Sequence, residues 1–414
     1  MTCDCLLMVP FEPPTGSIAD PRTRTTLGAR LFLPVVEALC GLESHLGRRI
    51  QFYRDTDRPL FGGSPFAYPE HRSLTAMTLA THLERTGLSW RAIDPGTQEI
   101  GWWRHELARF RDLHPKTVAV STTFVMSFPW AQTLLATIRR AFPRAKVIVG
   151  GYYYATDVKA FLSLDADVYV TGEGEIRLPA VVEAIRDGRP LDDIPGVYLP
   201  GPDGLKSTGR VEQLGLSTLP GIDWSLAERI EPPIGLQRGG MEMGVETQRG
   251  CVFKCEFCTY RTLSSSDLLE VEAAADRILA TRVARGGSIN MTDATATFPR
   301  HRWEALLDAL IRRGGSPHPI WAFARVSDID EEIARKMAAA NVRHLFIGQE
   351  SGDQEMLNRM KKGTRVSHVR PAVAALDRHG IVATFGMIHG FPGETAASIE
   401  ATRRLLATIN EGFD

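Results

Sequence analysis

Short apolar runs alternate with helical stretches along this chain of 414 residues, and the alternation limits what the chain can fold into. Strands separated by helices favour a parallel sheet with helices on its faces, because parallel neighbours need a long crossover connection. In the first half we expect strands at residues 5–10, 90–94, 117–121, 146–149 and 168–170, and helices at 74–86, 103–113, 130–142 and 178–187. Residues 1–200 are therefore predicted to form a doubly wound, Rossmann-like α/β domain.

The pattern changes between residues 188 and 240, where prolines recur. Proline lacks the backbone N–H that a helix interior or a central strand requires, so no long element is expected there. We predict a small hairpin and an ordered linker, with the domain boundary near residue 200 and the linker at residues 201–240.

The alternation restarts in the second half, with strands expected at residues 243–247, 288–292, 320–325, 344–349 and 381–389 and a last helix at 396–410. Five strand–helix units are too few for an eight-fold barrel, which takes about 250 residues. Residues 241–414 are therefore predicted to form a partial (β/α) TIM-type barrel. A sixth strand would be expected where the chain stops, so either the barrel is open or the sequence is a fragment of a longer polypeptide. We favour a fragment truncated at its C-terminal side.

Bulk composition excludes several classes of function. The chain is 43% hydrophobic and 23% charged with a net charge of −1, which is ordinary for a globular protein and gives no support for nucleic-acid binding by bulk charge. No run approaches the ~20 apolar residues of a membrane span, so no membrane partner is expected. Six cysteines, half of them clustered, fit a reducing compartment, and a cytoplasmic location is predicted. Cys3, Cys5 and Cys40 are interpreted as small buried hydrophobic side chains.

The other three cysteines, Cys251, Cys255 and Cys258, lie within eight positions just after the first expected strand of the barrel. Four thiolates would complete the coordination of a tetrahedral zinc ion or a four-iron cluster, whereas three leave one iron of a [4Fe–4S] cluster without a protein ligand. The alternatives are a structural zinc loop or incidental buried thiols. A zinc site would need a fourth ligand nearby, and no His or Cys occurs between residues 259 and 300.

The Cys-x3-Cys-x2-Cys loop after a barrel strand resembles the radical S-adenosylmethionine (radical SAM) superfamily. The resemblance implies a [4Fe–4S] cluster whose open iron chelates the amino and carboxylate groups of S-adenosylmethionine at the C-terminal mouth of the barrel. Phe257 matches the aromatic position beside the adenine.

Further segments resemble the same superfamily. Residues 346–352 look like its fourth-strand motif, which implies that Glu350 and Ser351 contact S-adenosylmethionine; an ordinary strand end with a helix N-cap is the alternative. Arg325 could pair with the carboxylate of the cofactor or form a surface salt bridge. Residues 388–395 look like the fifth-strand motif, with Gly390 at the adenine, and would otherwise be a tight turn.

In the first half, small or polar residues follow three expected strands, where ligands of doubly wound sheets bind. In this order before a radical SAM loop, they resemble the cobalamin-binding domain of cobalamin-dependent radical SAM enzymes. The resemblance implies cobalamin as a third cofactor, bound by Ser121, Thr122, Thr123, Gly150, Gly151, Tyr152, Gly172, Glu173 and Gly174.

His114 departs from the pattern of cobalamin proteins that ligate cobalt through histidine. Their D-x-H-x-x-G motif follows a strand, whereas Asp112-Leu113-His114 comes before one and has Thr117 at the glycine position. We interpret His114 as a surface or loop residue and predict that no histidine ligates the cobalt.

The resemblance implies a methyltransferase that moves a methyl group from S-adenosylmethionine via methylcobalamin to an unreactive carbon or phosphorus. The substrate would be a small molecule, an amino acid or a peptide precursor of a natural product, and flavodoxin or ferredoxin would be the electron donor. A cyclase or rearrangement enzyme without net methyl transfer is the rival, and an iron–sulfur or cobalamin-binding module without catalysis is a third possibility. The sequence singles out no catalytic residue.

Overall fold

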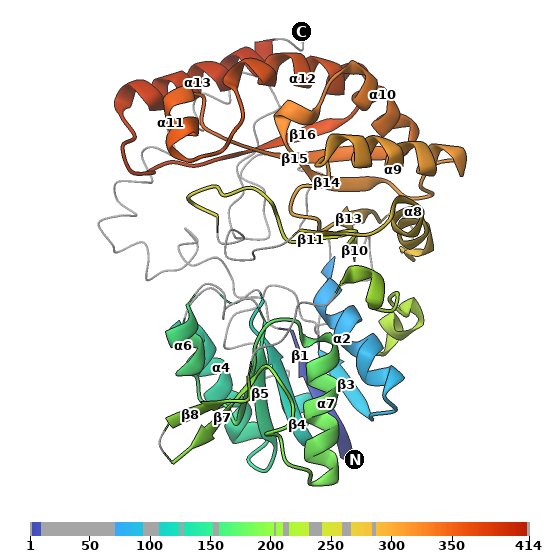
Figure 1. The fold of residues 1–414 in the computed structure, drawn as a ribbon, viewed down its shortest axis with the longest axis vertical. Coiled ribbons are helices and arrows are strands. Elements are labelled where there is room, and N and C mark those ends of the chain that lie inside the picture. The colour runs from blue at the N-terminus through green and yellow to red at the C-terminus, as the bar shows by residue number, and fades with distance from the viewer. Residues whose placement is uncertain are drawn as a thin grey trace. The chain divides into compact units, whose positions relative to one another are not determined.

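A computed structural model shows the fold (Figure 1). It describes residues 2–9, 71–93, 107–123, 125, 128–151, 157–202, 204–209, 215–231, 242–258, 266–283 and 287–411. The chain divides into two compact units, the first comprising Met1–Thr15 and Glu70–Gly239 and the second Gly16–Pro69 and Gly240–Asp414. Cys40 and Tyr152 lie outside the described residues.

The first unit contains an eight-stranded sheet in the order β8-β7-β6-β5-β4-β1-β3-β9. Its five central strands are parallel, and all five were expected from the sequence; they are β1 (Thr2–Met8), β3 (Trp90–Ile93), β4 (His114–Ser121), β5 (Lys146–Gly150) and β6 (Val168–Val170). Between and after them come α2 (Leu74–Arg85), α4 (Phe128–Ala141), α6 (Val158–Leu162) and α7 (Gly174–Asp187). This confirms the predicted α/β class.

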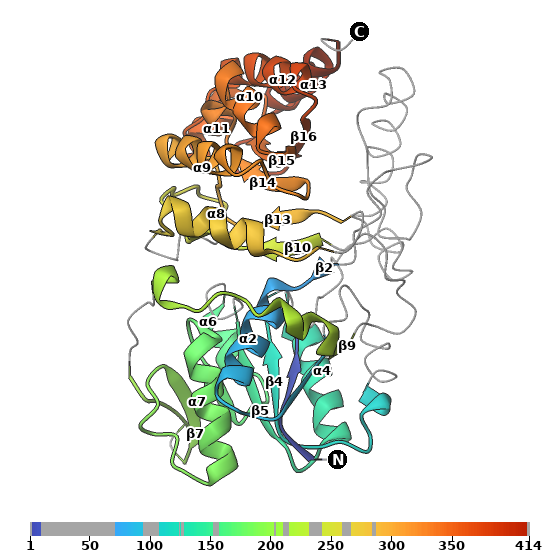
Figure 2. The same cartoon turned by 90° about the vertical axis from the view of Figure 1, so that its right-hand side faces the viewer.

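Both faces of this sheet are buried, which makes the domain doubly wound. Leu6 of β1 faces a core formed with α4, whereas Leu7 faces a second core formed with α2 and α7. Figure 2 shows α4 on one side of the sheet and α2 and α7 on the other. Cys3 and Cys5 lie in these two cores, and burial raises the pKa of their thiols to about 11 and about 12. Both are buried hydrophobic side chains, as predicted.

The order of the strands reverses beside β1. The chain first places β3 on one side of β1 and then adds β4, β5 and β6 in turn on the other side. Such a reversal opens a crevice at the C-terminal ends of the strands, and ligands of doubly wound sheets bind there. The ends of β1 and β4 flank it, with Met8 paired to Val120.

The expected hairpin consists of β7 (Val197–Gly201) and β8 (Gly204–Ser207), which are antiparallel. The segment expected as a linker also contributes to the first unit. Two 3-10 turns, η2 (Leu216–Thr218) and η3 (Trp224–Arg229), precede β9 (Ile230–Glu231), which pairs with β3. Leu226 and Ile230 are buried in the core formed with α2 and α7.

The second unit contains five parallel strands in chain order, as predicted. They are β10 (Glu242–Val245), β13 (Ile289–Met291), β14 (Ile320–Ala324), β15 (Val342–Glu350) and β16 (Val382–Met387). The helices are α8 (Val271–Ala280), α9 (Arg300–Arg312), α10 (Glu331–Ala339), α11 (Gln354–Arg359), α12 (Val369–Arg378) and α13 (Ala396–Glu411). Figure 2 shows α8 and α9 on one side of these strands.

Five further short elements in the described part of the chain were not expected from the sequence. β2 (His71–Arg72) precedes α2, and the 3-10 turns η5 (Val326–Asp328) and η6 (Val366–His368) follow β14 and α11. β11 (Gln248–Arg249) pairs antiparallel with β12 (Asp267–Leu268), so that Gln248 faces Leu268. This last pair joins the two ends of the segment that contains the three clustered cysteines.

Among the helices described, none combines the length and the apolar character that crossing a bilayer would require.

Candidate functional site

The first group of predicted site residues lies at the C-terminal ends of three neighbouring strands of the first unit. Ser121 is the last residue of β4 and pairs with Gly150, the last residue of β5. The Thr122 backbone N–H and hydroxyl both donate to the Gly150 carbonyl, at 2.6 and 2.7 Å. The Ser121 and Thr123 hydroxyls are 2.9 Å apart. The tertiary structure therefore brings the hydroxyl segment and the Gly-Gly turn together.

Gly151 allows the closest backbone approach at this edge. Its φ is +104°, and a Cβ atom there would lie 2.7 Å from the Thr123 nitrogen and 2.8 Å from the Thr122 nitrogen. Only glycine fits, because any side chain would clash with backbone and would be strained at that φ.

The third segment follows β6 and begins α7. Gly172 has φ +73°, Glu173 is the N-cap of α7, and Gly174 is its first residue. A Cβ on Gly174 would come within 3.3 Å of the Leu79 side chain, so this glycine serves the packing of α7 on α2. The sequence did not indicate Arg177, which is buried and donates a hydrogen bond to the Glu173 carbonyl.

His114 occupies the opposite edge of the sheet. It is the first residue of β4 and is exposed, whereas the candidate cobalamin residues follow the last residue of the same strand. Seven residue steps at 3.3 Å place its backbone about 23 Å from Ser121. This location fits the interpretation of His114 as a surface residue.

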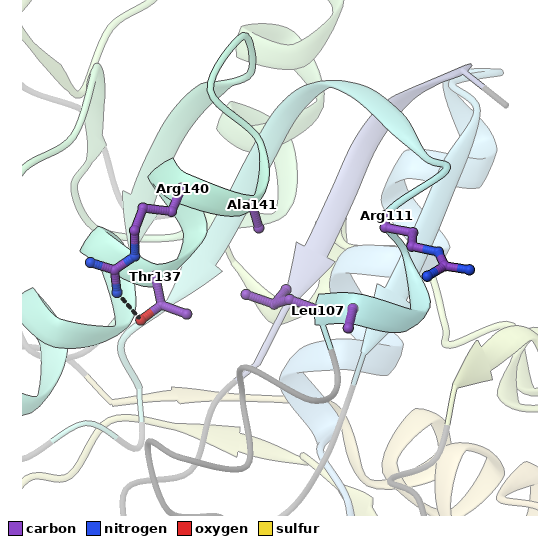
Figure 3. A pocket seen from close by; sticks show the side chains of 6 residues that line it. Leu107, Arg111, Thr137, Arg140 and Ala141 are labelled. Atoms are coloured by element: carbon purple, nitrogen blue, oxygen red, sulfur yellow. Dashed lines mark hydrogen bonds between the residues drawn. The ribbon is translucent and has the colours of Figure 1, made fainter.

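A shallow cavity of about 340 Å³ also lies at that opposite edge (Figure 3). It is lined by the C-terminal part of α4 and by residues that precede β4, and Arg140 donates a hydrogen bond to the Thr137 hydroxyl there. The cavity contains none of the predicted site residues, and it lies where doubly wound sheets do not bind their ligands.

In the second unit, the cysteine loop follows β10 and β11. Cys255 is buried, whereas Cys251 and Cys258 are partly exposed, and the Cys258 N–H donates to the Cys255 carbonyl at 3.1 Å. Burial raises the pKa of the Cys255 thiol, and the positive charge of Lys362 opposes that rise. In the described part of the chain, no three His, Cys, Asp or Glu side chains are arranged around a single metal ion. The ligands of a cluster bind separate irons and need not converge in that way.

The loop after α11 holds the cysteine loop in place. The Glu256 N–H donates to the Met360 carbonyl at 2.9 Å, and the Glu256 carboxylate forms an ion pair with Lys361. The Arg325 guanidinium donates to the carbonyls of Lys362 and Gly363, at 3.1 Å each.

Arg325 is not part of a surface salt bridge, so that alternative was wrong. Its side chain is buried, and its guanidinium carbon lies 3.6 Å from the centroid of the Phe253 ring in the cysteine loop. A buried guanidinium near the thiols favours the binding of a negatively charged group next to it.

Glu350 ends β15 at a β-bulge, and its carboxylate contacts Lys362 in the loop after α11. The φ of Glu350 is +70°, which costs a non-glycine residue about 1–2 kcal/mol. Its carboxylate lies 2.9 Å from the Lys362 ammonium, and the two side chains are 10% and 12% exposed. Glu350 is thus a strand end, and the N-cap of the following helix is Asp353, which accepts from the Met356 N–H; contact of Glu350 with S-adenosylmethionine stays a prediction.

Ser351 is buried, and its hydroxyl already has partners within the fold. It accepts from the Asp353 N–H at 3.1 Å and lies 3.3 Å from the Thr402 hydroxyl of α13. These contacts attach α13 to the end of β15, so the structure indicates an anchoring role and leaves cofactor contact by Ser351 a prediction.

Gly390 has φ +81° with open space where a Cβ would be, and its N–H donates to the Glu394 carboxylate at 2.7 Å. The Glu394 N–H donates to the Phe391 carbonyl, so the segment does form a turn.

The Phe257 ring in the cysteine loop lies 5.6 Å from the Lys362 ammonium.

Sequence reasoning missed Asp293, which follows β13 and holds the start of the cysteine segment. Its buried carboxylate accepts from the N–H groups of Thr247 and Gln248, at 2.7 and 2.9 Å. Burial raises its pKa to about 6. Arg302 is also buried and donates to the Thr247 and Leu269 carbonyls. The sequence feature that could have identified Asp293 is its position just after an expected strand of the barrel.

Two segments of the chain match known domain families. Residues 245–406 match the radical SAM superfamily, and residues 67–182 match the B12 binding domain. The chain contains a radical SAM domain and a B12-binding domain.

Curated relatives of this chain include enzymes of different reactions. The anaerobic magnesium-protoporphyrin IX monomethyl ester cyclase of Cereibacter sphaeroides is 24% identical over 312 residues, 72% of this chain and 50% of the cyclase. The uncharacterized methyltransferase PH0819 of Pyrococcus horikoshii is 26% identical over 247 residues, 57% of this chain and 51% of that protein. The chain thus spans about half the length of each relative.

The solved structure of the radical SAM methyltransferase TsrM from Kitasatospora setae, with cobalamin and a [4Fe–4S] cluster bound, has the same fold. The TM-score is 0.69 at 19% identity, over 99% of this chain and 73% of that chain.

The two domain types imply a [4Fe–4S] cluster, S-adenosylmethionine and cobalamin as cofactors. The residues of this chain fit them. Three thiols lie on one loop; burial raises the pKa of the Cys255 thiol, and the positive charges of Lys362 and Arg325 are close enough to oppose that rise, which suits a cluster of net negative charge. At the edge of the first sheet, the hydroxyl segment after β4 packs so closely on Gly151 that a Cβ there would lie 2.7 Å from the Thr123 nitrogen, which leaves an edge of small and hydroxyl-bearing residues. The assignment of individual residues to the cofactors stays a prediction.

Proposed function

We propose that this chain is a cobalamin-dependent methyltransferase that transfers a methyl group from S-adenosylmethionine to an unreactive carbon or phosphorus. The substrate class would be a small molecule, an amino acid or a peptide precursor. The observation that carries the proposal is the pairing of a B12-binding domain with a radical SAM domain in one chain, together with a fold shared over 99% of its length with the methyltransferase TsrM.

Each group of residues has a task in this proposal. Cys251, Cys255 and Cys258 hold the cluster and leave one iron open. Arg325 offers a buried positive charge to the cofactor carboxylate, and Glu350 accepts a hydrogen bond from its amino group or ribose. When bound, the cluster and S-adenosylmethionine supply a reducing electron and the methyl group, and cobalamin carries that methyl group to the substrate.

The edge of the first sheet would bind cobalamin mainly through backbone and hydroxyl groups. Ser121, Thr122 and Thr123 present hydroxyls, and Gly150, Gly151 and Gly172 allow close approach of a large flat ligand. Tyr152, Glu173 and Gly174 complete the proposed contacts. A donor such as flavodoxin or ferredoxin would deliver the electron.

Anaerobic reconstitution with iron, sulfide and cobalamin tests the proposal. The protein is then incubated with S-adenosylmethionine carrying a deuterated methyl group, a reductant and a small-molecule extract, and products are followed by mass. We expect a product in which a deuterated methyl group replaces a hydrogen, together with release of S-adenosylhomocysteine. Consumption of S-adenosylmethionine without any labelled product would contradict methyl transfer.

A second candidate is a cyclase or rearrangement enzyme that uses the same cofactors. The match to the magnesium-protoporphyrin ester cyclase over 72% of this chain favours it. The same incubation separates the two reactions, because a cyclase or rearrangement enzyme would convert its substrate into a product that carries no deuterated methyl group.

A further inference from the structure

Lys362 connects two parts of the candidate site in the second unit, although nothing in the sequence singled it out. Its ammonium lies 2.9 Å from the Glu350 carboxylate and 5.6 Å from the centroid of the Phe257 ring. Phe257 directly precedes Cys258. A single cation therefore contacts both the end of β15 and the cysteine loop.

Two local features accompany the Lys362–Glu350 ion pair: a glycine at position 348 and a positive φ at Glu350. A Cβ on Gly348 would lie 2.4 Å from the Glu350 carboxylate and 2.8 Å from the Lys362 ammonium, so a side chain at this position would displace the charged ends from their present positions. Glu350 itself sits at φ +70°. Backbone strain of this kind persists where the surrounding structure enforces it, and it concentrates at functional sites.

The backbone of Lys362 is held in position from both sides. Arg325 donates to the carbonyls of Lys362 and Gly363, and the Met360 carbonyl accepts from the Glu256 N–H of the cysteine loop. The distance between the lysine and the thiols is therefore set by hydrogen bonds and not by a flexible surface loop.

Packing alone does not account for a buried ion pair. Replacing such a pair by apolar residues of similar volume is often neutral or stabilising, whereas removing one partner leaves an uncompensated charge. A charged pair beside three thiols has a direct electrostatic effect on whatever charge those thiols hold.

We propose that Lys362 and Glu350 form a charge pair that sets the reduction potential of the [4Fe–4S] cluster, with Lys362 as the positioning residue that holds Glu350 toward the cysteine loop. The proposal rests on ligation of the cluster by the three cysteines and is independent of which atom of the substrate is methylated. Reduction adds negative charge to the cluster, so a nearby cation favours it and a nearby anion opposes it.

This reasoning predicts opposite effects for the two partners. Removing the lysine leaves the carboxylate alone and disfavours reduction, whereas removing the carboxylate leaves the ammonium alone and favours it. A residue with a merely structural role would shift the potential in the same direction from either side.

The experiment is a redox titration of the reconstituted full chain at pH 8 without S-adenosylmethionine, with the reduced cluster measured by electron paramagnetic resonance. At a fixed potential, Lys362→Met should lower the ratio of reduced to oxidised cluster about tenfold, and Glu350→Gln should raise it about tenfold, each corresponding to about 59 mV. The double variant should return to within about threefold of the wild-type ratio.

Lys361→Met is the matched control. Lys361 is the neighbouring lysine and pairs with Glu256 of the same loop, but its side chain is 65% exposed. Solvent screens its charge, so the cluster ratio should stay unchanged. Lys362→Arg, which retains the charge, should restore the wild-type ratio.

Shifts of equal sign in the two single variants, or no shift in either, would overturn the inference while the wild-type cluster remains intact. If Lys362→Met takes up no iron, the test rests on Glu350→Gln. Only a raised ratio of reduced to oxidised cluster in that variant agrees with the inference. A wild-type chain that binds no cluster would overturn the cluster ligation and this inference together.

Discussion

The C-terminal edges of the two sheets differ in the chemistry that they present. In the first unit the edge consists largely of glycines, hydroxyls and backbone groups, and Gly151 permits an approach that no other residue would. In the second unit the corresponding edge carries three thiols, the buried charges of Arg325 and Glu350, and Lys362, whose side chain is 12% exposed. One edge therefore presents small and uncharged groups, whereas the other presents thiols and charged side chains.

The largest expected effect is the loss of the cluster when one thiol is removed. Cys255→Ala should reduce bound iron at least tenfold, because Cys255 is the buried thiol of the loop, while cobalamin binding stays within about twofold. Iron analysis and the cobalamin absorbance after gel filtration measure both. Val252→Ala in the same loop is the control, since Val252 is 48% exposed. Full iron content in Cys255→Ala would remove Cys255 from the ligand set.

The second largest effect is expected for Asp293→Asn, which removes the carboxylate that holds the start of the cysteine segment. The amide oxygen of asparagine can accept from the backbone N–H groups of both Thr247 and Gln248, but its NH2 group cannot accept from the Thr247 hydroxyl, which donates to the second carboxylate oxygen of Asp293. We therefore expect a loss of about 2 kcal/mol in unfolding free energy near pH 5. Denaturant unfolding measures it. Asp276→Asn on α8 is the control, because Asp276 is 73% exposed.

The cost of Asp293→Asn should depend on pH. The folded-state pKa of Asp293 is raised to about 6, above the usual aspartate value, so the folded chain binds a proton between about pH 4 and 6 that the unfolded chain releases. Stability from this group is therefore present at low pH and is lost as pH rises through that window, by at most about 3 kcal/mol. The difference in unfolding free energy between wild type and variant should therefore shrink as pH rises from about 4 to 6. A difference that does not depend on pH would contradict the uptake of a proton by buried Asp293.

Gly151→Ala tests the uncharged edge, with a smaller expected effect. The added Cβ would lie 2.7 Å from a backbone nitrogen, so cobalamin binding should weaken at least tenfold, or about 1.4 kcal/mol. Gly188→Ala is the matched control, since Gly188 also has a positive φ, of +69°, but has nothing within 4 Å of the Cβ position. Equal losses in both variants would mean that backbone strain, and not contact at this edge, determines binding. Equilibrium titration with cobalamin measures the difference.

For the last variant, at His114, we expect no effect. His114→Ala should leave the electron paramagnetic resonance spectrum of bound cob(II)alamin unchanged, because His114 lies at the other edge of the sheet. Nitrogen hyperfine coupling in the wild type that disappears in the variant would make His114 the cobalt ligand.

The sequence predicted most of the elements that build these two edges. Apolar runs such as residues 117–121 and 168–170 are buried on both faces, and glycines at 150, 151 and 172 punctuate the strand ends, so local pattern was sufficient. The 3-residue and 4-residue spacing of the cysteines likewise carries its meaning within one loop. The short pair β11–β12 was not predicted, because two-residue strands have no periodicity to detect.

The charged residues of the second edge were predicted less well. Arg325 could equally have been a surface residue until the structure buried it against Phe253, and Ser351 turned out to bond to Thr402 on the last helix. Lys362 and Asp293 were not identified at all, since each acts on residues 12 or more positions away. Such partners are brought together only by the parallel arrangement of strands and helices.

By itself, the sequence determined the two α/β domains, their order and the three-cysteine loop, because strand and helix periodicity and ligand spacing are local properties of the chain. Only the tertiary structure decided which charges lie buried beside the thiols and which glycine approaches which backbone. Burial and pairing depend on neighbours that are distant in sequence, and the free energy of a charged group is set by those neighbours rather than by its own residue type.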